Sequence, residues 1–292
     1  MPDGMTILLL TYATTVLLAQ GARATATTCQ PPTSHVRESG VPELSGLAVS
    51  RSLAGRLWTH NDSGQPALFA LNTEGAVTGR VQLTGVTFQD WEALATGPCP
   101  TGSCVYAGDI GDNAARRESV AVYRFPEPAA SQTSVAVKEV YYGRYSDGAH
   151  DAEALLVTPD GAIYIVTKGE TGPVALYRFP RDLRVGMVHT LERVGKPRDG
   201  AKTANTDRIT DGTVSANGQW VALRTGRRVT FHRAALFFAG DWTSDRAIDL
   251  RTVAEPQGEA VALGAGEVYV AGEAGPKAAA GTFARFACSG IQ

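Results

Sequence analysis

The feature that most constrains this chain is an internal repeat with a period of 48 to 61 residues. Each of five segments begins with an acidic or small polar residue and runs into an apolar stretch. A turn and a second apolar stretch follow, and the second stretch ends in polar residues. Repeats of this length with about four strands each are typical of β-propeller blades. The acids on which the repeats align are Glu43, Glu92, Glu153, Asp211 and Glu259.

The sequence therefore predicts an all-β chain that forms a single β-propeller. The direct count is five blades, and it becomes six if a long connection contains a degenerate blade. The last repeat, 258–288, is one strand short, and the stretch from Cys29 to Ser39 could supply that strand. We therefore expect the ring to be closed by an N-terminal strand. Since composition does not change along 27–292, we predict one domain there.

The N-terminus predicts export. An apolar run from Ile7 to Ala19 is followed by small residues that suit cleavage after Ala24 or Ala26, so residues 1–26 resemble a secretory signal peptide. The run is shorter than the roughly 20 apolar residues of a membrane-spanning helix. Residues 1–5 contain no Lys or Arg, so an ordinary N-terminal tail stays an alternative. The prediction is a secreted, extracellular bacterial protein with no membrane segment after cleavage.

The four cysteines favour the same compartment, because an even number suits disulfides. Cys99 and Cys104 flank a turn with Pro and Gly, where a short hairpin would bring them together. Cys29 and Cys288 lie near opposite ends of the chain, and a bridge between them would lock the ring. A zinc site is the competing interpretation, but the paired spacing of such sites is missing. We predict two disulfides, 29–288 and 99–104.

The formal net charge of −2 provides no basic field, so nucleic acid is not a predicted partner.

The repeated acids are expected to lie close together in the fold. In an up-and-down blade, the residues that enter the innermost strand and those that leave the second strand lie at the same end of the sheet. The repeated acids and the polar clusters should therefore gather at one mouth of the channel. We expect a small-molecule or glycan ligand there, on a monomer.

Several carboxylates around one opening repel each other unless a cation or ligand neutralises them. Calcium takes six to eight oxygen ligands and suits such a site. The alternative is structural, since acids in turns often cap backbone N–H groups. The predicted Ca²⁺ ligands are Glu43, Asn61, Asp62, Glu92, Asp109, Asp112, Asn113, Glu153 and Glu259.

Three further residues are candidates for catalysis. His60 could act as a general base on cation-bound water, or it could only orient a neighbouring acid. Lys168 and Arg224 follow the second strands of two repeats and would bind an anionic group or pair with the acids. A serine hydrolase or zinc protease is not predicted, because the chain has neither a Gly-x-Ser-x-Gly nor a His-Glu-x-x-His motif.

Several motifs resemble a group of secreted bacterial β-propeller proteins that have no assigned activity, and the resemblance extends over most of the chain after residue 40. It implies fold and export, not a reaction. The motifs are His60-Asn-Asp-Ser-Gly, Asp90-Trp-Glu-Ala-Leu, Gly108-Asp-Ile-Gly-Asp-Asn and Asp151-Ala-Glu-Ala-Leu-Leu.

A more distant similarity is to the calcium-dependent lactonase and phosphotriesterase propellers. It implies a Ca²⁺ site with Glu43, Asn61, Asp109 and Glu153 as the nearest matches by position. Calcium-rich propeller phytases are a second analogy, but they need a more basic face than this chain offers. Three hypotheses follow: a metal-dependent hydrolase of esters, lactones or phosphoesters; a non-catalytic propeller that binds a glycan, peptide or protein; and a five-bladed glycosidase that uses paired carboxylates.

Overall fold

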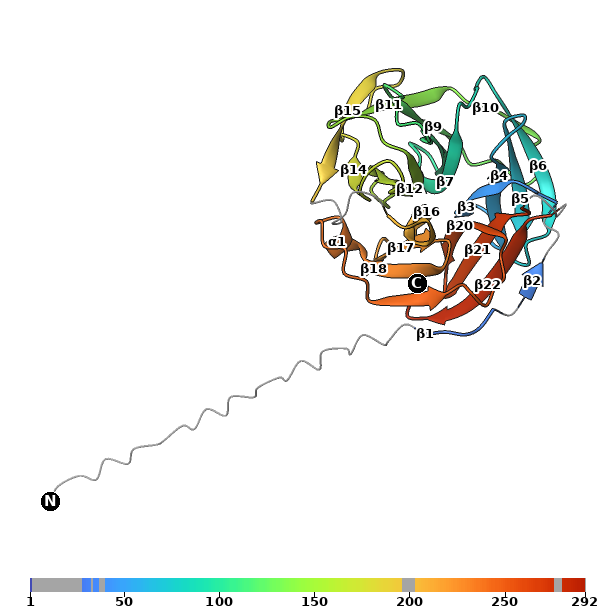
Figure 1. Cartoon of the computed structure of the whole chain (residues 1–292), viewed down its shortest axis with the longest axis vertical. Coiled ribbons are helices and arrows are strands. Elements are labelled where there is room, and N and C mark those ends of the chain that lie inside the picture. The colour runs from blue at the N-terminus through green and yellow to red at the C-terminus, as the bar shows by residue number, and fades with distance from the viewer. Residues whose placement is uncertain (2–27, 33, 37–39, 196–202, 276–279, 292) are drawn as a thin grey trace.

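The computed structural model of the chain describes residues 1, 28–32, 34–36, 40–195, 203–275 and 280–291. The proposed signal peptide therefore lies almost entirely outside the described residues. Within them the regular structure is almost entirely strand, with one 3-10 helix and one short α-helix, which confirms the predicted all-β class. Figure 1 shows the strands as successive groups around a central axis, with β3, β7, β12, β16 and β20 nearest the centre.

Two sheets hold the first half of the chain. In one, the order is β10-β6-β5-β4-β3, and β10 runs parallel to β6. The second sheet begins with the antiparallel series β7-β8-β9-β11. The bounds are β3 Leu44–Val49, β4 Arg56–Asn61, β5 Ala67–Asn72, β6 Val77–Thr84, β7 Trp91–Pro98, β8 Ser103–Asp109, β9 Val120–Pro126, β10 Ser134–Ala136 and β11 Glu139–Tyr145.

The second sheet continues beyond β11, because β11 pairs in parallel with β15 and so joins the series β12-β13-β14-β15. A third sheet has the order β16-β17-β18-β19. The bounds are β12 Ala152–Val157, β13 Ile163–Thr167, β14 Leu176–Arg178, β15 Val188–Val194, the 3-10 helix η1 Asn205–Asp207, β16 Ile209–Val214, β17 Trp220–Thr225, β18 Arg228–Arg233, α1 Ala234–Phe237 and β19 Arg246–Asp249.

The fourth sheet joins the two ends of the chain. It has the order β1-β22-β21-β20, and β2 also pairs with β22. Cys29 lies opposite Cys288 in the β1–β22 ladder, and the two form a disulfide. The predicted N-terminal closing strand and both predicted disulfides are therefore confirmed. The bounds are β1 Thr28–Cys29, β2 Ser34–Val36, β20 Gln257–Gly264, β21 Glu267–Glu273 and β22 Thr282–Ser289.

Apolar side chains fill the space between neighbouring sheets or strand series. One cluster joins Trp58 of β4 to Leu94 of β7, and another joins Leu155 of β12 to Ala93 of β7. Strands packed on both faces read as continuous apolar runs rather than alternating ones. Accordingly, all five residues of β13, from Ile163 to Thr167, are buried. Each inner strand contacts the next in the order β3, β7, β12, β16, β20, and β20 contacts β3.

Candidate functional site

The inner strands share a local irregularity near their first residues. In each, the ladder to the second strand shifts register, so that one residue is extra and forms a β-bulge. Bulges turn a side chain away from its regular direction and are common beside functional sites. The residues at the bulges are Ser45, Glu92, Glu153, Thr210 and Glu259.

All five bulge residues line one cavity of about 620 Å³. The cavity lies at the end of the ring where the inner strands begin, which is the predicted mouth. Six carboxylic acids and three cationic residues line it. The acids are Asp62, Glu92, Glu153, Glu255, Glu259 and Glu273, and the cations are Lys168, Arg208 and Arg227. We call this space the acidic cavity.

The bulges correct the alignment made on the sequence. Glu92, Glu153 and Glu259 are equivalent, as predicted, but Glu43 and Asp211 are not. Ser45 and Thr210 occupy the equivalent positions in β3 and β16. A shift of one or two residues is invisible in an apolar pattern, yet in a strand a one-residue shift turns the side chain to the opposite face.

The closest group of acids is formed by Asp62, Asp90 and Glu92. Each offers one carboxylate oxygen, and these three atoms all lie within 4.8 Å of one another. Asp62 follows β4, and Asp90 precedes β7, so two neighbouring sheets contribute. Asp90 was not among the predicted ligands, although it belongs to the Asp-Trp-Glu motif. It lies only two residues before the aligned acid Glu92, and this short spacing could have indicated that it belongs to the same site.

Burial and mutual repulsion raise the pKa values of these acids. Desolvation raises the pKa of Glu92 to about 10, and the charges of Glu153, Asp90 and Asp62 add to it. Burial also raises the pKa values of Asp62 and Asp90, with the neighbouring acids as the second cause. The protons held by this group are therefore ones that a cation could displace.

Lys168 is the main counter-charge within the cavity. Its Nζ forms an ion pair with Glu153 and lies 3.7 Å from a carboxylate oxygen of both Asp151 and Glu170. Burial alone would lower the pKa of Lys168, but Glu153 holds it above its ordinary value. Burial raises the pKa of Glu153 to about 8 even beside Lys168, and Glu259 contributes in the same direction.

Glu273 also lines the acidic cavity, and the charge of Glu259 acts on it. Desolvation, followed by that charge, raises the pKa of Glu273 to about 7. Arg208 pairs with Glu170 at 2.9 Å, whereas Arg227 is exposed at the rim. Glu273 was not predicted, because it lies at the end of a second strand that the repeat pattern marks only by a change to polar residues.

Two of the predicted catalytic residues lie outside the cavity. The His60 ring is fully buried and stacked on Trp91, with ring centroids 3.9 Å apart. Its Nε2 accepts a hydrogen bond from the Gly46 N–H, and burial lowers its pKa to about 3. Arg224 is also fully buried and donates to the carbonyls of Ala260 and Ala271.

Four predicted metal ligands also lie outside the acidic cavity, and three of them are acids that bind other parts of the chain. Asp109 is buried, and its Oδ1 accepts hydrogen bonds from the Asp90 N–H and Arg117 Nη1. The Asp112 carboxylate accepts the Arg117 N–H at 2.8 Å. Glu43 is exposed and accepts a hydrogen bond from Ser63. These three acids organise the surrounding loops, whereas the acidic cavity brings together Asp62, Glu92, Asn113, Glu153 and Glu259 from the predicted set.

A second hollow of about 550 Å³ adjoins this group, lined by Asn61, Asp62, Asp90 and the aromatic residues Phe88 and Trp91. Phe88 and Trp91 are stacked, with centroids 4.0 Å apart. The remaining predicted ligand, Asn61, therefore lies beside the Asp62–Asp90–Glu92 group rather than within the acidic cavity. Its Oδ1 is buried and has no hydrogen-bond partner among the described residues.

Comparisons with known proteins support the fold only. No family model matches the chain, and no curated protein matches it. Among solved structures, it is similar to the PQQ-bound form of an aldose sugar dehydrogenase from Streptomyces coelicolor, a β-propeller-like protein. The identity is 11% and the TM-score 0.53, over 92% of this chain and all of that one. The likeness supports a β-propeller-like fold for this chain.

Proposed function

We propose that a hard divalent cation, with Ca²⁺ the best chemical match, binds between Asp62, Asp90 and Glu92, where the acidic cavity meets the adjoining hollow. The observation that carries this proposal is the approach of one oxygen from each of these acids to within 4.8 Å of the others. Calcium–oxygen distances are about 2.3–2.6 Å, so two ligands on opposite sides of one ion lie roughly 5 Å apart. All-oxygen ligands select Ca²⁺ or Mg²⁺ over softer metals.

The reaction class we infer is hydrolysis of an ester, lactone or phosphoester bond. A bound cation polarises a carbonyl or phosphoryl oxygen and activates water. Glu153 supports this assignment, because a carboxylic acid with a pKa of about 8 suits proton transfer near neutral pH. Since His60 is enclosed, Glu153 and its partner Lys168 replace His60 as the proposed proton-transfer group.

The cofactor of the similar structure is not part of this proposal. PQQ is an organic polyanion, and the acidic cavity is lined by twice as many carboxylic acids as cations. A polyanion would raise the pKa values of these acids further and would find few cations to pair with, so the residues do not fit that cofactor.

The proposal includes a five-bladed architecture and export. Five antiparallel series of strands surround the axis, and the series β7–β11 and β12–β15 are fused into one sheet through β11 and β15. Two disulfides support an oxidising compartment. Among the described residues, no helix is long and apolar enough to cross a membrane.

The test is calorimetric titration of Ca²⁺ into chelator-stripped mature protein. We expect saturable binding that Glu92→Gln weakens by about 30-fold or more, because one charged ligand is lost. Glu192→Gln is the matched control, since Glu192 is an exposed acid on β15 that pairs with Arg178. Equal binding by all three proteins, or none by the wild type, would refute the cation site. Binding without turnover of any ester, lactone or phosphoester would leave a non-catalytic binding protein.

A further inference from the structure

A further cavity, distinct from the acidic cavity and from the hollow beside Asn61, lies at the opposite end of the inner strands. Its volume is about 430 Å³. In every inner strand the residue four positions after the bulge residue lines this cavity. A strand rises about 3.3 Å per residue, so the two cavities are separated by roughly 13 Å of inner strand. The five residues are Val49, Thr96, Val157, Val214 and Leu263.

The wall of this further cavity is mostly apolar. Ala48, Ala95 and Ala265 add small side chains to the larger ones of the inner strands. The Thr96 hydroxyl is already used, because it donates to the Val49 carbonyl at 2.8 Å. Among the described residues that line the cavity, the one charged residue is Arg51. An apolar hollow of a few hundred Å³ with few polar groups is typical of small-ligand sites.

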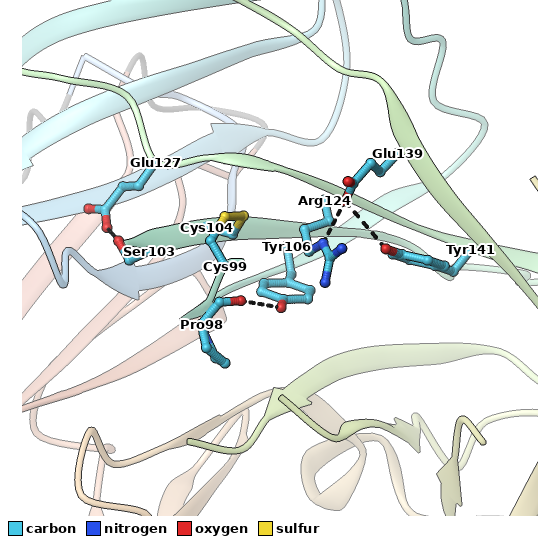
Figure 2. The surroundings of a disulfide bond; sticks show 9 residues. All are labelled: Pro98, Cys99, Ser103, Cys104, Tyr106, Arg124, Glu127, Glu139 and Tyr141. Atoms are coloured by element: carbon cyan, nitrogen blue, oxygen red, sulfur yellow. Dashed lines mark hydrogen bonds and ion pairs between the residues drawn. A yellow bond between two sulfur atoms is a disulfide. The ribbon is translucent and has the colours of Figure 1, made fainter. Parts of the chain in front are cut away.

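Arg51 is half-buried, and its guanidinium makes no hydrogen bond or ion pair with the part of the chain that the structure describes. Burial lowers the pKa of Arg51, while the charge of Glu127 acts in the opposite direction. Glu127 is itself saturated: its carboxylate accepts hydrogen bonds from Ser50, Ser103, the Trp58 indole and the Arg51 backbone N–H. Figure 2 shows Glu127 beside Ser103.

A partly buried charge without a hydrogen-bond partner is unfavourable, and an anion that reaches it would relieve the cost. The neighbouring wall offers apolar surface instead of further cations. A single guanidinium beside apolar side chains matches a ligand with one negative charge and a hydrocarbon body.

We propose that this apolar cavity binds a small amphipathic monocarboxylate, such as a medium-chain fatty acid, with its carboxylate on Arg51 and its chain against the inner-strand residues. The site is separate from the acidic cavity, and the proposal does not depend on the cation. On this proposal the two ends of the ring bind opposite kinds of ligand: a cation at the acidic end and an amphipathic anion at the apolar end.

The test is calorimetric titration with octanoate, 1-octanol and octylammonium. We expect octanoate to bind most tightly and octylammonium least. Arg51→Gln should weaken octanoate about tenfold, the magnitude of one charge-assisted hydrogen bond, and leave 1-octanol unchanged. Arg181→Gln, on a highly exposed arginine in another part of the chain, is the matched control.

A second variant tests the cavity itself. Ala216 lines the cavity but is exposed in the turn after β16, so Ala216→Phe should fold and block entry. We expect it to abolish binding of both octanoate and 1-octanol, whereas Glu92→Gln should leave octanoate binding intact. Equal binding of octanoate and octylammonium, no loss in Arg51→Gln or Ala216→Phe, or no octanoate binding at all would overturn the proposal.

Discussion

The Asp211 carboxylate bridges two inner strands: its Oδ1 accepts the Gly212 N–H at 2.7 Å, and its Oδ2 accepts the Val261 N–H at 2.8 Å. Val261 belongs to β20, the inner strand that follows β16 in the ring. Asp211 is fully buried, so both amides depend on it. A side chain next to a bulge thus fastens one strand series to the next.

Removal of this bridge should destabilise the protein. Asp211→Ala leaves two buried N–H groups unpaired, and we expect a loss of about 2–4 kcal/mol in the free energy of unfolding. Asp211→Asn should cost less, because its amide oxygen can still accept one of the two hydrogen bonds. Denaturant unfolding measures both, with the exposed Asp249→Ala as control. A loss no larger than that of Asp249→Ala would contradict the bridge.

Stability without a divalent cation should fall as pH rises. The ordinary pKa of a Glu side chain is 4.5, while the folded-state pKa values of Glu153 and Glu92 are raised to about 8 and about 10. Groups with raised folded-state pKa values contribute stability that is complete below pH 4.5 and is lost as pH rises through the raised values. Thermal melts in chelator from pH 5 to 9 should show the fall.

Glu92→Gln should flatten this pH dependence and stabilise the metal-free protein at pH 9 by about 1–3 kcal/mol, because a neutral amide replaces a carboxylate that is costly to ionise. The exposed control Glu192→Gln should keep the wild-type slope. An identical slope in wild type and Glu92→Gln would show that Glu92 is ionised at little cost.

Cation binding should release protons. Because the group Asp62, Asp90 and Glu92 holds protons that the ion must displace, we expect release of about one proton per Ca²⁺ near pH 8. Calorimetry in buffers with different ionisation enthalpies measures this number directly. The apparent affinity should rise with pH up to about 10. Binding without proton release would place the ion away from Glu92.

The two disulfides should differ in their contribution to stability. Cys29–Cys288 closes 259 residues, whereas Cys99–Cys104 closes 5. The chain-entropy relation gives ~5.6 kcal/mol for the first and ~2 kcal/mol for the second. The double variants Cys29→Ser with Cys288→Ser and Cys99→Ser with Cys104→Ser test this by denaturant unfolding. Equal losses would mean that the ends of the chain are held as firmly by the β1–β22 and β2–β22 ladders alone.

Glu127 should stabilise the contact between the β3–β4 turn and β8. Burial alone would raise its pKa, but hydrogen bonds from Ser103, Ser50 and Trp58 lower it below 4.5. The stability it contributes is therefore present above pH 4.5 and lost as pH falls through the lowered value. Glu127→Ala should cost about 1–3 kcal/mol at pH 7, from the donors left unpaired.

Glu139→Ala is the control for Glu127, since Glu139 lies apart from Glu127, beside Arg124 (Figure 2), and pairs with Arg124 at 2.6 Å while staying partly exposed. We expect a smaller loss, because exposed ion pairs contribute little. Equal losses in urea unfolding at pH 7 would contradict the special role of Glu127.

The fold could be predicted because its cause is repeated in the sequence. Strands packed on both faces read as apolar runs such as Ile163–Val166, and the recurrence of such runs predicts a ring of similar units. The closure of the ring could also be predicted, since a ring must join its first and last strands and the sequence has Cys29 and Cys288 near those strands. The parallel pairing of β11 with β15 was not, because it depends on how two outer strands meet in space.

The site could be predicted as a region but not residue by residue. The acids were found because they recur, yet only the ladder register shows that Glu92, Glu153 and Glu259 occupy bulges while Glu43 and Asp211 do not. His60 stood among acids in the sequence, but alternation along β4 and stacking on Trp91 bury it. Side-chain direction at a bulge is a property of pairing, which one strand alone does not encode.

The disulfide that joins the first and last strands of the ring has a mechanical consequence. Both ends of the described ring lie in the same sheet (Figure 1). In that sheet Cys29 is bonded to Cys288. A force that pulls the two chain ends apart is therefore carried by one covalent bond and bypasses the 258 residues between them. In a force spectrometer the oxidised protein should extend by only the short segments outside the bridge. After reduction the same pull should peel strands from the ring and release the full contour length.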